Sequence, residues 1–260
     1  MILCLDVGNT SIHGGVFNEK RLILQFRKTS SFRGSSDEIG IFLRSVLNEN
    51  DLDPKQISHI GICSVVPDAI HSLRNACIKY FGIRPFELGP GAKIGLKINY
   101  RNPAEVGADR IAAAVAAVDQ FPGKNLILID FGTATTFDVV TSDGNYAGGI
   151  IAPGINLAVK ALGDGAALLP KIEVVKPDRV IGTGTVSAMQ SGIYWGYMGL
   201  IEGIVTRIRA SYGQGVPFKV IATGGLAPLF ADGTDVIDVT DPDLTLHGLV
   251  LLHQMNGAAS

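Results

Sequence analysis

The chain has 260 residues, 47% of them hydrophobic and 18% charged, a composition that excludes a disordered chain and suits one large core or two small ones. A formal net charge of -2 gives no basic field for nucleic acid or an anionic membrane, so neither is an expected partner. No apolar run approaches membrane-spanning length, and the start of the chain lacks the basic region of a signal peptide.

The first half predicts three strands followed by alternating helices and strands, in the order βββαβαβα. Ser35-Ser36-Asp37-Glu38 is a capping box with apolar residues at helical spacing behind it, and so predicts the start of the first helix. The other expected elements are strands at 2–7, 14–17, 22–26, 59–66 and 85–88, a helix at 68–81 and an alanine-rich helix at 105–120.

The second half repeats this order with one inserted helix. Its expected elements are strands at 126–131, 135–140, 145–151, 218–222 and 235–239, a helix after Pro153-Gly154, a long helix at 185–211, a short helix after Gly224-Gly225 and a last helix at 244–255. We therefore expect two lobes, residues 1–120 and 121–260.

A motif recurs 124 positions apart: Asp6-Val7-Gly8-Asn9-Thr10 and Asp130-Phe131-Gly132-Thr133 each follow an apolar strand. The carboxylates could bind Mg²⁺, the glycines let backbone approach a phosphate, and the amide and hydroxyl groups can donate hydrogen bonds. One copy alone would favour a hairpin turn that Asp and Gly merely shape. The recurrence favours two half-domains with a nucleotide cleft between them.

Gly107-Ala108-Asp109-Arg110 opens the alanine-rich helix. Asp109 could accept the proton of a substrate hydroxyl, while Arg110 could bind a substrate carboxylate through two hydrogen bonds. The alternative is ordinary: an acid in a first turn favours the helix dipole, and the arginine is a solvated surface charge.

Other motifs carry less information. Gly224-Gly225, between a strand and a helix, could lie against an adenosine moiety or could simply make a tight connection. A nicotinamide cofactor and a P-loop are rejected because neither glycine fingerprint is complete. His13 lies near enough to the first turn to touch a phosphate.

The three cysteines, Cys4, Cys63 and Cys77, stand in separate apolar segments. This spacing favours reduced, buried thiols and a cytoplasmic protein.

Small residues follow one face of the long helix: Ala188, Gly192, Gly196, Gly199 and Gly203. Each helical glycine costs roughly 0.5–1 kcal/mol relative to alanine, so a compensating close contact is expected. That contact is either a homodimer interface or packing inside one subunit.

Together these motifs resemble type III pantothenate kinase over nearly the whole chain. The resemblance also covers Ser64-Val65-Val66-Pro67, Gly89-Pro90-Gly91, Asn102-Pro103, Gly148-Gly149-Ile150-Ile151-Ala152-Pro153-Gly154 and Ala222-Thr223-Gly224-Gly225. It implies an α/β fold of two duplicated ribonuclease H-like half-domains, the acetate and sugar kinase, heat-shock 70 and actin fold, in agreement with the repeated element order.

The resemblance implies ATP-dependent phosphorylation of pantothenate to 4'-phosphopantothenate, the first step toward coenzyme A. The implied ATP-phosphate ligands are Asp6, Val7, Gly8, Asn9, Thr10 and Thr133, with Mg²⁺ held by Asp6 through ATP. Asp109 is the implied base, and Asp130 the implied site of a monovalent cation, K⁺ or NH₄⁺. The implied pantothenate contacts are Tyr100, Gly107, Ala108, Asp109, Arg110 and Thr185. A homodimer with a shared substrate site is also implied.

Two alternatives remain: another small-molecule kinase of the same superfamily, or a regulatory relative that has lost catalysis. The first would need no arginine beside Asp109, and such kinases are usually longer. The second is disfavoured because Asp6, Asp109 and Arg110 are all present. A nucleotide switch of the actin type is disfavoured because 260 residues leave little room for its insertions.

Overall fold

The computed structural model describes residues 1–29, 34–166, 168–213 and 215–257, which form two compact units. The first unit comprises Met1–Leu96, Tyr100–Asp119 and the described residues from Leu244 onward. The second comprises Lys97–Asn99 and Gln120–Asp243. Each unit is built on one mixed sheet.

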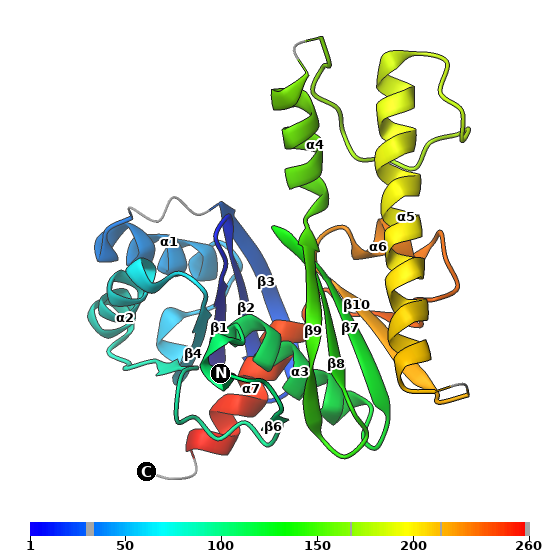
Figure 1. The fold of residues 1–260 in the computed structure, drawn as a ribbon. Helices are drawn as coiled ribbons and strands as arrows, with labels where there is room; N and C mark the ends of the chain where they lie inside the picture. The colour runs from blue at the N-terminus through cyan, green and yellow to red at the C-terminus, as the bar shows by residue number, and fades with distance from the viewer. Residues whose placement is uncertain (30–33, 167, 214, 258–260) are drawn as a thin grey trace. The chain divides into compact units, whose positions relative to one another are not determined.

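The first unit contains a five-stranded sheet (Figure 1). Its strands are β1 (Ile2–Val7), β2 (Ser11–Asn18), β3 (Arg21–Thr29), β4 (His59–Ser64) and β5 (Phe86–Glu87). They lie in the order β3-β2-β1-β4-β5, with β1–β2 and β2–β3 antiparallel and β1–β4 and β4–β5 parallel.

Strand β1 contributes side chains to two hydrophobic cores, because successive side chains of a strand point to opposite faces. Leu3, Leu5 and Val7 pack with α1 (Ser36–Asn48) and α2 (Pro67–Phe81). Ile2 and Cys4 pack with α3 (Ala108–Gln120) and α7 (Leu244–Gly257). Asp6 shares the parity of Ile2 and Cys4, so it lies on the sheet face that α3 and α7 cover.

The predicted capping box at the start of α1 is confirmed. The Glu38 amide donates to Ser35 Oγ over 3.2 Å, and the Ser35 amide donates to Glu38 Oε2 over 2.7 Å. Both bonds satisfy amides that the first turn of a helix would otherwise leave unpaired.

The second unit repeats the first topology. Its strands are β7 (Asn125–Phe131), β8 (Ala134–Val140), β9 (Asn145–Pro153), β10 (Phe218–Thr223), β11 (Val239–Thr240) and β6 (Lys97–Ile98). The order is β11-β10-β7-β8-β9-β6, with β7–β8 and β8–β9 antiparallel and β7–β10 and β10–β11 parallel. Strands β7 to β11 thus match β1 to β5 in order and direction, which confirms the predicted duplication.

The helices of the second unit are α4 (Ile155–Gly165), α5 (Thr185–Ser211) and α6 (Ala227–Ala231). Helix α5 begins and ends where the sequence predicted, and Figure 1 shows it as the long yellow helix beside the sheet. Its Tyr194, Tyr197 and Ile201 form one core with Phe230 of α6 and with β7. No helix in the described ranges is long and apolar enough to cross a membrane.

Besides small shifts of element bounds, the described residues differ from the expected elements in the following ways. The last helix, α7, was assigned to a lobe of residues 121–260, but it packs in the first unit because Leu246, Leu249 and Leu252 join the core beneath β1. The strand expected at 235–239 is only Val239–Thr240. Strand β6 was not predicted, since two residues carry no readable periodicity.

Candidate active site

The first Asp-x-Gly turn connects β1 and β2. The Gly8 amide donates to the Ser11 carbonyl oxygen over 3.0 Å, which closes the turn. The side chains of Asn9 and Thr10 are exposed at its tip, while Val7 is buried in the core. The turn therefore presents amide and hydroxyl groups to solvent from a buried strand.

A row of polar side chains crosses the first sheet beside this turn. Asp6 lies opposite His13 on β2 and opposite Cys63 on β4, and His13 in turn lies opposite Arg27 on β3. Paired residues of neighbouring strands share a face, so these four side chains form one line, here called the first row: Arg27, His13, Asp6 and Cys63.

The Asp6 carboxyl group has an unusual electrostatic environment. It keeps some exposed surface, yet loss of hydration, together with the negative charge of Asp109, raises its pKa to about 7. A hydrogen bond from Cys63 and the charge of Arg27 act in the opposite direction. Two acids therefore lie close enough to repel each other, an arrangement suited to binding a cation or a metal–phosphate complex.

The start of α3 supplies the second acid. The Gly107 carbonyl accepts the first helical hydrogen bond, from the Ile111 amide over 3.1 Å, and Ala108 opens the helix. The Arg110 amide donates to Asp109 Oδ1 over 2.8 Å, which orients that carboxylate. The structure thus brings together Asp6 and Asp109, which the sequence separates by about a hundred positions.

The second Asp-x-Gly turn connects β7 and β8, and the Gly132 amide donates to the Ala134 carbonyl over 3.1 Å. Two glycines from other loops support it by close backbone approach. A Cβ at Gly154 would lie 2.1 Å from the Thr133 carbonyl oxygen, and one at Gly224, which has φ of +90°, would lie 2.7 Å from Asp130 Oδ1. Only glycine fits at either position.

Hydroxyl groups flank the second acid. Asp130 lies opposite Thr136 on β8 and opposite Thr223 on β10, and we call these three residues the second row. Thr223 is buried. Within the described part of the chain, Thr136 Oγ1 is buried without a hydrogen-bond partner.

The remaining predicted site residues lie as follows. Thr133 is exposed at the tip of its turn, and Gly225 is exposed before α6. Tyr100 is half-buried ahead of α3, and Thr185 is the exposed first residue of α5. His13 is buried and forms a 2.9 Å hydrogen bond with the Gln25 amide nitrogen, so it lies within the sheet and not at the turn.

The described residues contain no cluster of three His, Cys, Asp or Glu side chains that could hold a metal ion. Mg²⁺ is usually bound by one or two carboxylates together with substrate phosphates, so a single acid such as Asp6 still fits it. A monovalent cation takes oxygen ligands, and the unpaired Thr136 hydroxyl opposite Asp130 fits that chemistry.

Sequence reasoning missed the partner of Asp6. The Cys63 thiol donates to Asp6 Oδ1 over 3.2 Å, although the sequence indicated only an inert buried thiol. The sequence did place Cys63 near the end of a strand, just before Ser64. The structure shows that this strand, β4, is parallel to β1. The register that sets Cys63 opposite Asp6 could not be read from either strand alone.

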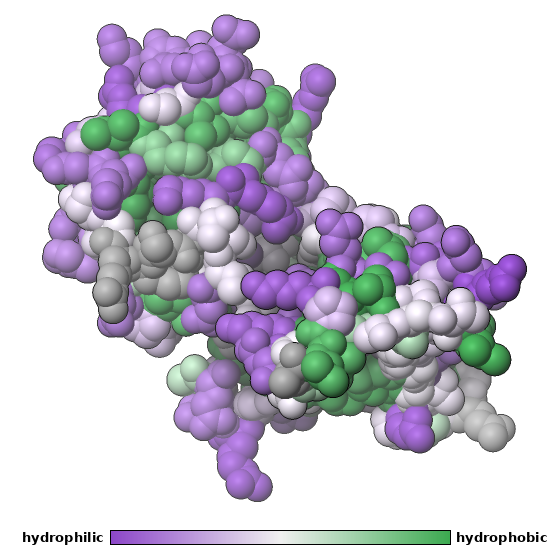
Figure 2. Space-filling view, turned by 90° about the horizontal axis from the view of Figure 1, so that it is seen from above, coloured by the Kyte–Doolittle hydropathy of each residue, from purple (hydrophilic) through white to green (hydrophobic). Residues whose placement is uncertain are grey.

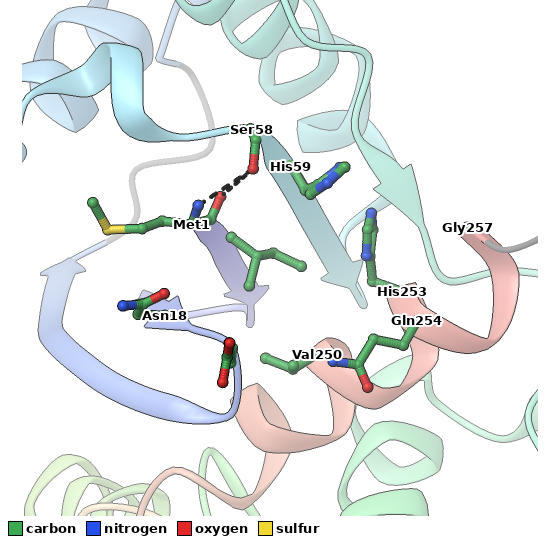
Figure 3. A pocket seen from close by; sticks show the side chains of 10 residues that line it. Met1, Asn18, Ser58, His59, Val250, His253, Gln254 and Gly257 are labelled. Carbon is green, nitrogen blue, oxygen red and sulfur yellow. Dashed lines mark hydrogen bonds between the residues drawn. The ribbon is translucent and has the colours of Figure 1, made fainter.

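A separate cavity of about 680 Å³ lies at the other end of β1 (Figure 3). It is lined by residues that include Met1, Ser58, Val250 and the facing imidazoles of His59 and His253, whose ring centroids lie 4.7 Å apart. No predicted site residue lines it, so the two Asp-x-Gly turns and this cavity are distinct places.

A family model described as type III pantothenate kinase matches residues 2–207. The type III pantothenate kinase of Legionella pneumophila strain Corby is 50% identical over 258 residues, which cover 99% of this chain and 100% of the relative.

Two solved structures share the fold at low sequence identity. One is an activator of 2-hydroxyisocaproyl-CoA dehydratase from Clostridium difficile with bound ADPNP: TM-score 0.56, 13% identity, covering 99% of this chain and 95% of that one. The other is a ROK hexokinase from Thermus thermophilus: TM-score 0.50, 14% identity, covering 100% and 99%. They confirm the expected duplicated α/β fold of the sugar kinase and actin type.

Proposed function

The chain belongs to the type III pantothenate kinase family, and we propose that Asp6, Asp109 and Arg110 of its first unit carry out the phosphoryl transfer. The activity is ATP-dependent phosphorylation of pantothenate to 4'-phosphopantothenate, the first step of coenzyme A synthesis. The observation that carries the assignment of roles is that Asp109, at the start of α3, lies close enough to Asp6 for its charge to raise the pKa of Asp6.

Asp109 is the proposed general base. The pantothenate hydroxyl oxygen attacks the γ-phosphorus of ATP, a new phosphorus–oxygen bond forms as the bond to the bridging oxygen breaks, ADP leaves, and the hydroxyl proton passes to the Asp109 carboxylate. Arg110 binds the pantothenate carboxylate through its planar guanidinium. Residues one apart on a helix diverge by about 100°, so the two side chains grip different parts of one ligand.

The first turn, Asp6 to Thr10, is the proposed phosphate site. Asp6 would hold Mg²⁺ together with ATP phosphates, and the bound ion would supply neutralisation of phosphate charge. Thr133 and the backbone at Gly224 and Gly225 are proposed to contact the nucleotide as well. Support comes from the exposed positions of Asn9, Thr10, Thr133 and Gly225.

Asp130 is the proposed site of a monovalent cation, K⁺ or NH₄⁺. Its support is the buried Thr136 hydroxyl, which lacks a hydrogen-bond partner in the described ranges and faces the same side of the sheet. We expect K⁺ to activate the wild-type enzyme and Asp130→Asn to lose that activation. Activation that survives Asp130→Asn would place the cation elsewhere.

We propose a homodimer formed through the second unit. A Cβ at Gly192, Gly196 or Gly199 of α5 would meet no atom within 4 Å apart from its own stretch of helix, so among the described residues this face is not packed within the subunit. Hydrophobic side chains reach the surface of this unit among polar ones (Figure 2). The exposed ones include Ile151, Leu157, Leu162, Val186 and Trp195. Such a contact would serve a substrate site shared between subunits, with Tyr100 and Thr185 as its proposed pantothenate contacts.

The dimer is tested with Gly196→Leu. The added side chain enters open space in one subunit, so the midpoint of thermal unfolding of the monomer should hold, while the mass measured by light scattering should halve. An unchanged dimer mass would exclude this face.

We also propose that the enzyme works in the cytoplasm, because all three cysteines are buried and form no disulfides, as expected of a reducing compartment.

The decisive experiment for the function is a coupled assay of ADP release with pantothenate and ATP, with and without K⁺. Turnover should need pantothenate and Mg²⁺ and should rise with K⁺. Glucose and acetate serve as control acceptors, and turnover with either one in place of pantothenate would reject the assignment.

A further inference from the structure

We infer that Cys63 is a positioning residue: its thiol holds the Asp6 carboxylate in the orientation that binds the magnesium complex of ATP. The inference rests on the role proposed above for Asp6 and adds a residue to that site.

The geometry of the contact is direct. Cys63 lies opposite Asp6 in the β1–β4 register, and its Sγ lies 3.2 Å from Asp6 Oδ1. The Cys63 side chain has 0% exposed surface, so water does not reach the thiol. A thiol is a weak donor, and here its S–H points to a carboxylate oxygen, which can only accept.

Cys63 supplies the hydrogen bond to the Asp6 carboxylate, whereas Asp109 and Arg27 act on it through their charges. Asp109 carries the same charge and repels it, and Arg27 attracts it from an exposed position two strands away. A carboxyl group rotates readily about its last side-chain bond. A short-range donor on the adjacent strand fixes one oxygen and so defines where the other points.

The internal repeat supplies an independent comparison. In the second unit, Thr223 on β10 stands opposite Asp130 just as Cys63 on β4 stands opposite Asp6. Thr223 is also buried, and its hydroxyl is also a donor. Both halves of the molecule therefore place a small buried donor side chain beside the acid that opens the turn.

The test compares Cys63→Ala with Cys63→Ser, two residues of nearly equal size of which only serine keeps a donor. We expect Cys63→Ala to raise KM for MgATP and Kd for MgADP about threefold to tenfold, the range expected for one weak hydrogen bond, and to leave KM for pantothenate unchanged. Cys63→Ser should restore both constants to within about twofold of wild type.

Cys77→Ala is the matched control. It deletes an equally buried thiol from the other core of the same unit, between α1 and α2, and should leave both nucleotide constants at the wild-type value. Thermal unfolding of all variants checks that they are folded. A partly unfolded variant would lose turnover with both KM values intact, which separates a structural effect from positioning.

The inference would be overturned if Cys63→Ala had the wild-type KM for MgATP and Kd for MgADP. It would also be overturned if Cys63→Ala and Cys63→Ser raised these two constants equally. Since MgADP binding is measured by calorimetry without turnover, it also distinguishes a failure of the proposed function from a failure of the Cys63 inference. A wild-type protein that binds MgADP but does not phosphorylate pantothenate would reject the proposed function, while the Cys63 comparison could still be read from Kd.

Discussion

The two Asp-x-Gly turns occupy the same place in two sheets of the same topology, yet their acids have different neighbours. In the first row, Asp6 stands between His13 and Cys63 and close to Asp109. In the second row, Asp130 stands between two threonines and against the backbone of Gly224.

The difference shows that a repeated motif sets position but does not set charge. Two acids close together in the first unit favour a divalent metal–nucleotide complex and a proton acceptor. One acid among hydroxyl and carbonyl oxygens in the second unit favours a singly charged cation. The duplicated sheet topology is thus compatible with two different binding roles.

The largest expected effect comes from removing the second acid of the first unit. Asp109→Asn should lower turnover by about 10² to 10⁴, because the hydroxyl proton loses its acceptor, while MgADP still binds. Steady-state kinetics and calorimetry measure the two quantities. Asp119→Asn, at the exposed end of the same helix, is the control and should retain wild-type turnover. Near-normal turnover of Asp109→Asn would remove it from the base role.

Arg110→Ala should have the next largest effect. Loss of a charge-assisted bond to the pantothenate carboxylate should raise KM for pantothenate roughly tenfold to a hundredfold, with KM for ATP unchanged. Initial rates at varied pantothenate concentration measure this. The exposed Arg84, changed to Ala, should show neither effect. If KM for pantothenate stays constant in Arg110→Ala, the carboxylate binds elsewhere.

Gly154→Ala and Gly8→Ala compare the supports of the two turns. The new Cβ at residue 154 would collide with the Thr133 carbonyl, whereas at residue 8 its nearest neighbour is the Ser11 carbonyl at an ordinary 3.6 Å. Gly154→Ala should therefore lose about 1–3 kcal/mol of unfolding free energy, and Gly8→Ala about 0.5 kcal/mol or less. Urea denaturation measures both. Equal losses would show that the second turn is no more tightly supported than the first.

A last prediction concerns the pH dependence of stability that Asp6 contributes. Its pKa is raised from 3.8 to about 7 on folding, so the folded state holds a proton that the unfolded chain releases. This contribution is complete below about pH 4 and is lost as pH rises through about 7. Asp6→Asn cannot ionise, so its unfolding free energy relative to wild type should rise across that window. Urea titrations at pH 4, 5.5 and 7.5 measure it, and a constant difference would contradict the raised pKa.

Much of the fold could be predicted because local patterns decided it. The capping box at Ser35 and Glu38 set the start of α1, and the long apolar and small-residue pattern set both ends of α5. The bounds of the short strands could not be predicted, and β6 was not expected at all. Strands β6 and β11 have two residues each and exist only because a longer neighbour offers an open edge.

The candidate site was predicted in part. The acids and glycines of both turns could be identified because the motif recurs. Roles that depend on packing could not: His13 is held inside the sheet by Gln25, and Gly224 touches Asp130 from a different loop. The assignment of α7 also failed for this reason, since an apolar helix can cover either sheet equally well by its sequence.

The sequence by itself determined the repeat, the residue types of the two turns and the family to which the chain belongs, because these depend on order and spacing along the chain. Only the tertiary structure decided that Cys63 is the partner of Asp6, that Asp109 is its repelling neighbour and that α7 closes the first unit. Those relations arise from strand register and helix packing, which bring together groups whose mutual electrostatic and hydrogen-bonding energies no single segment encodes.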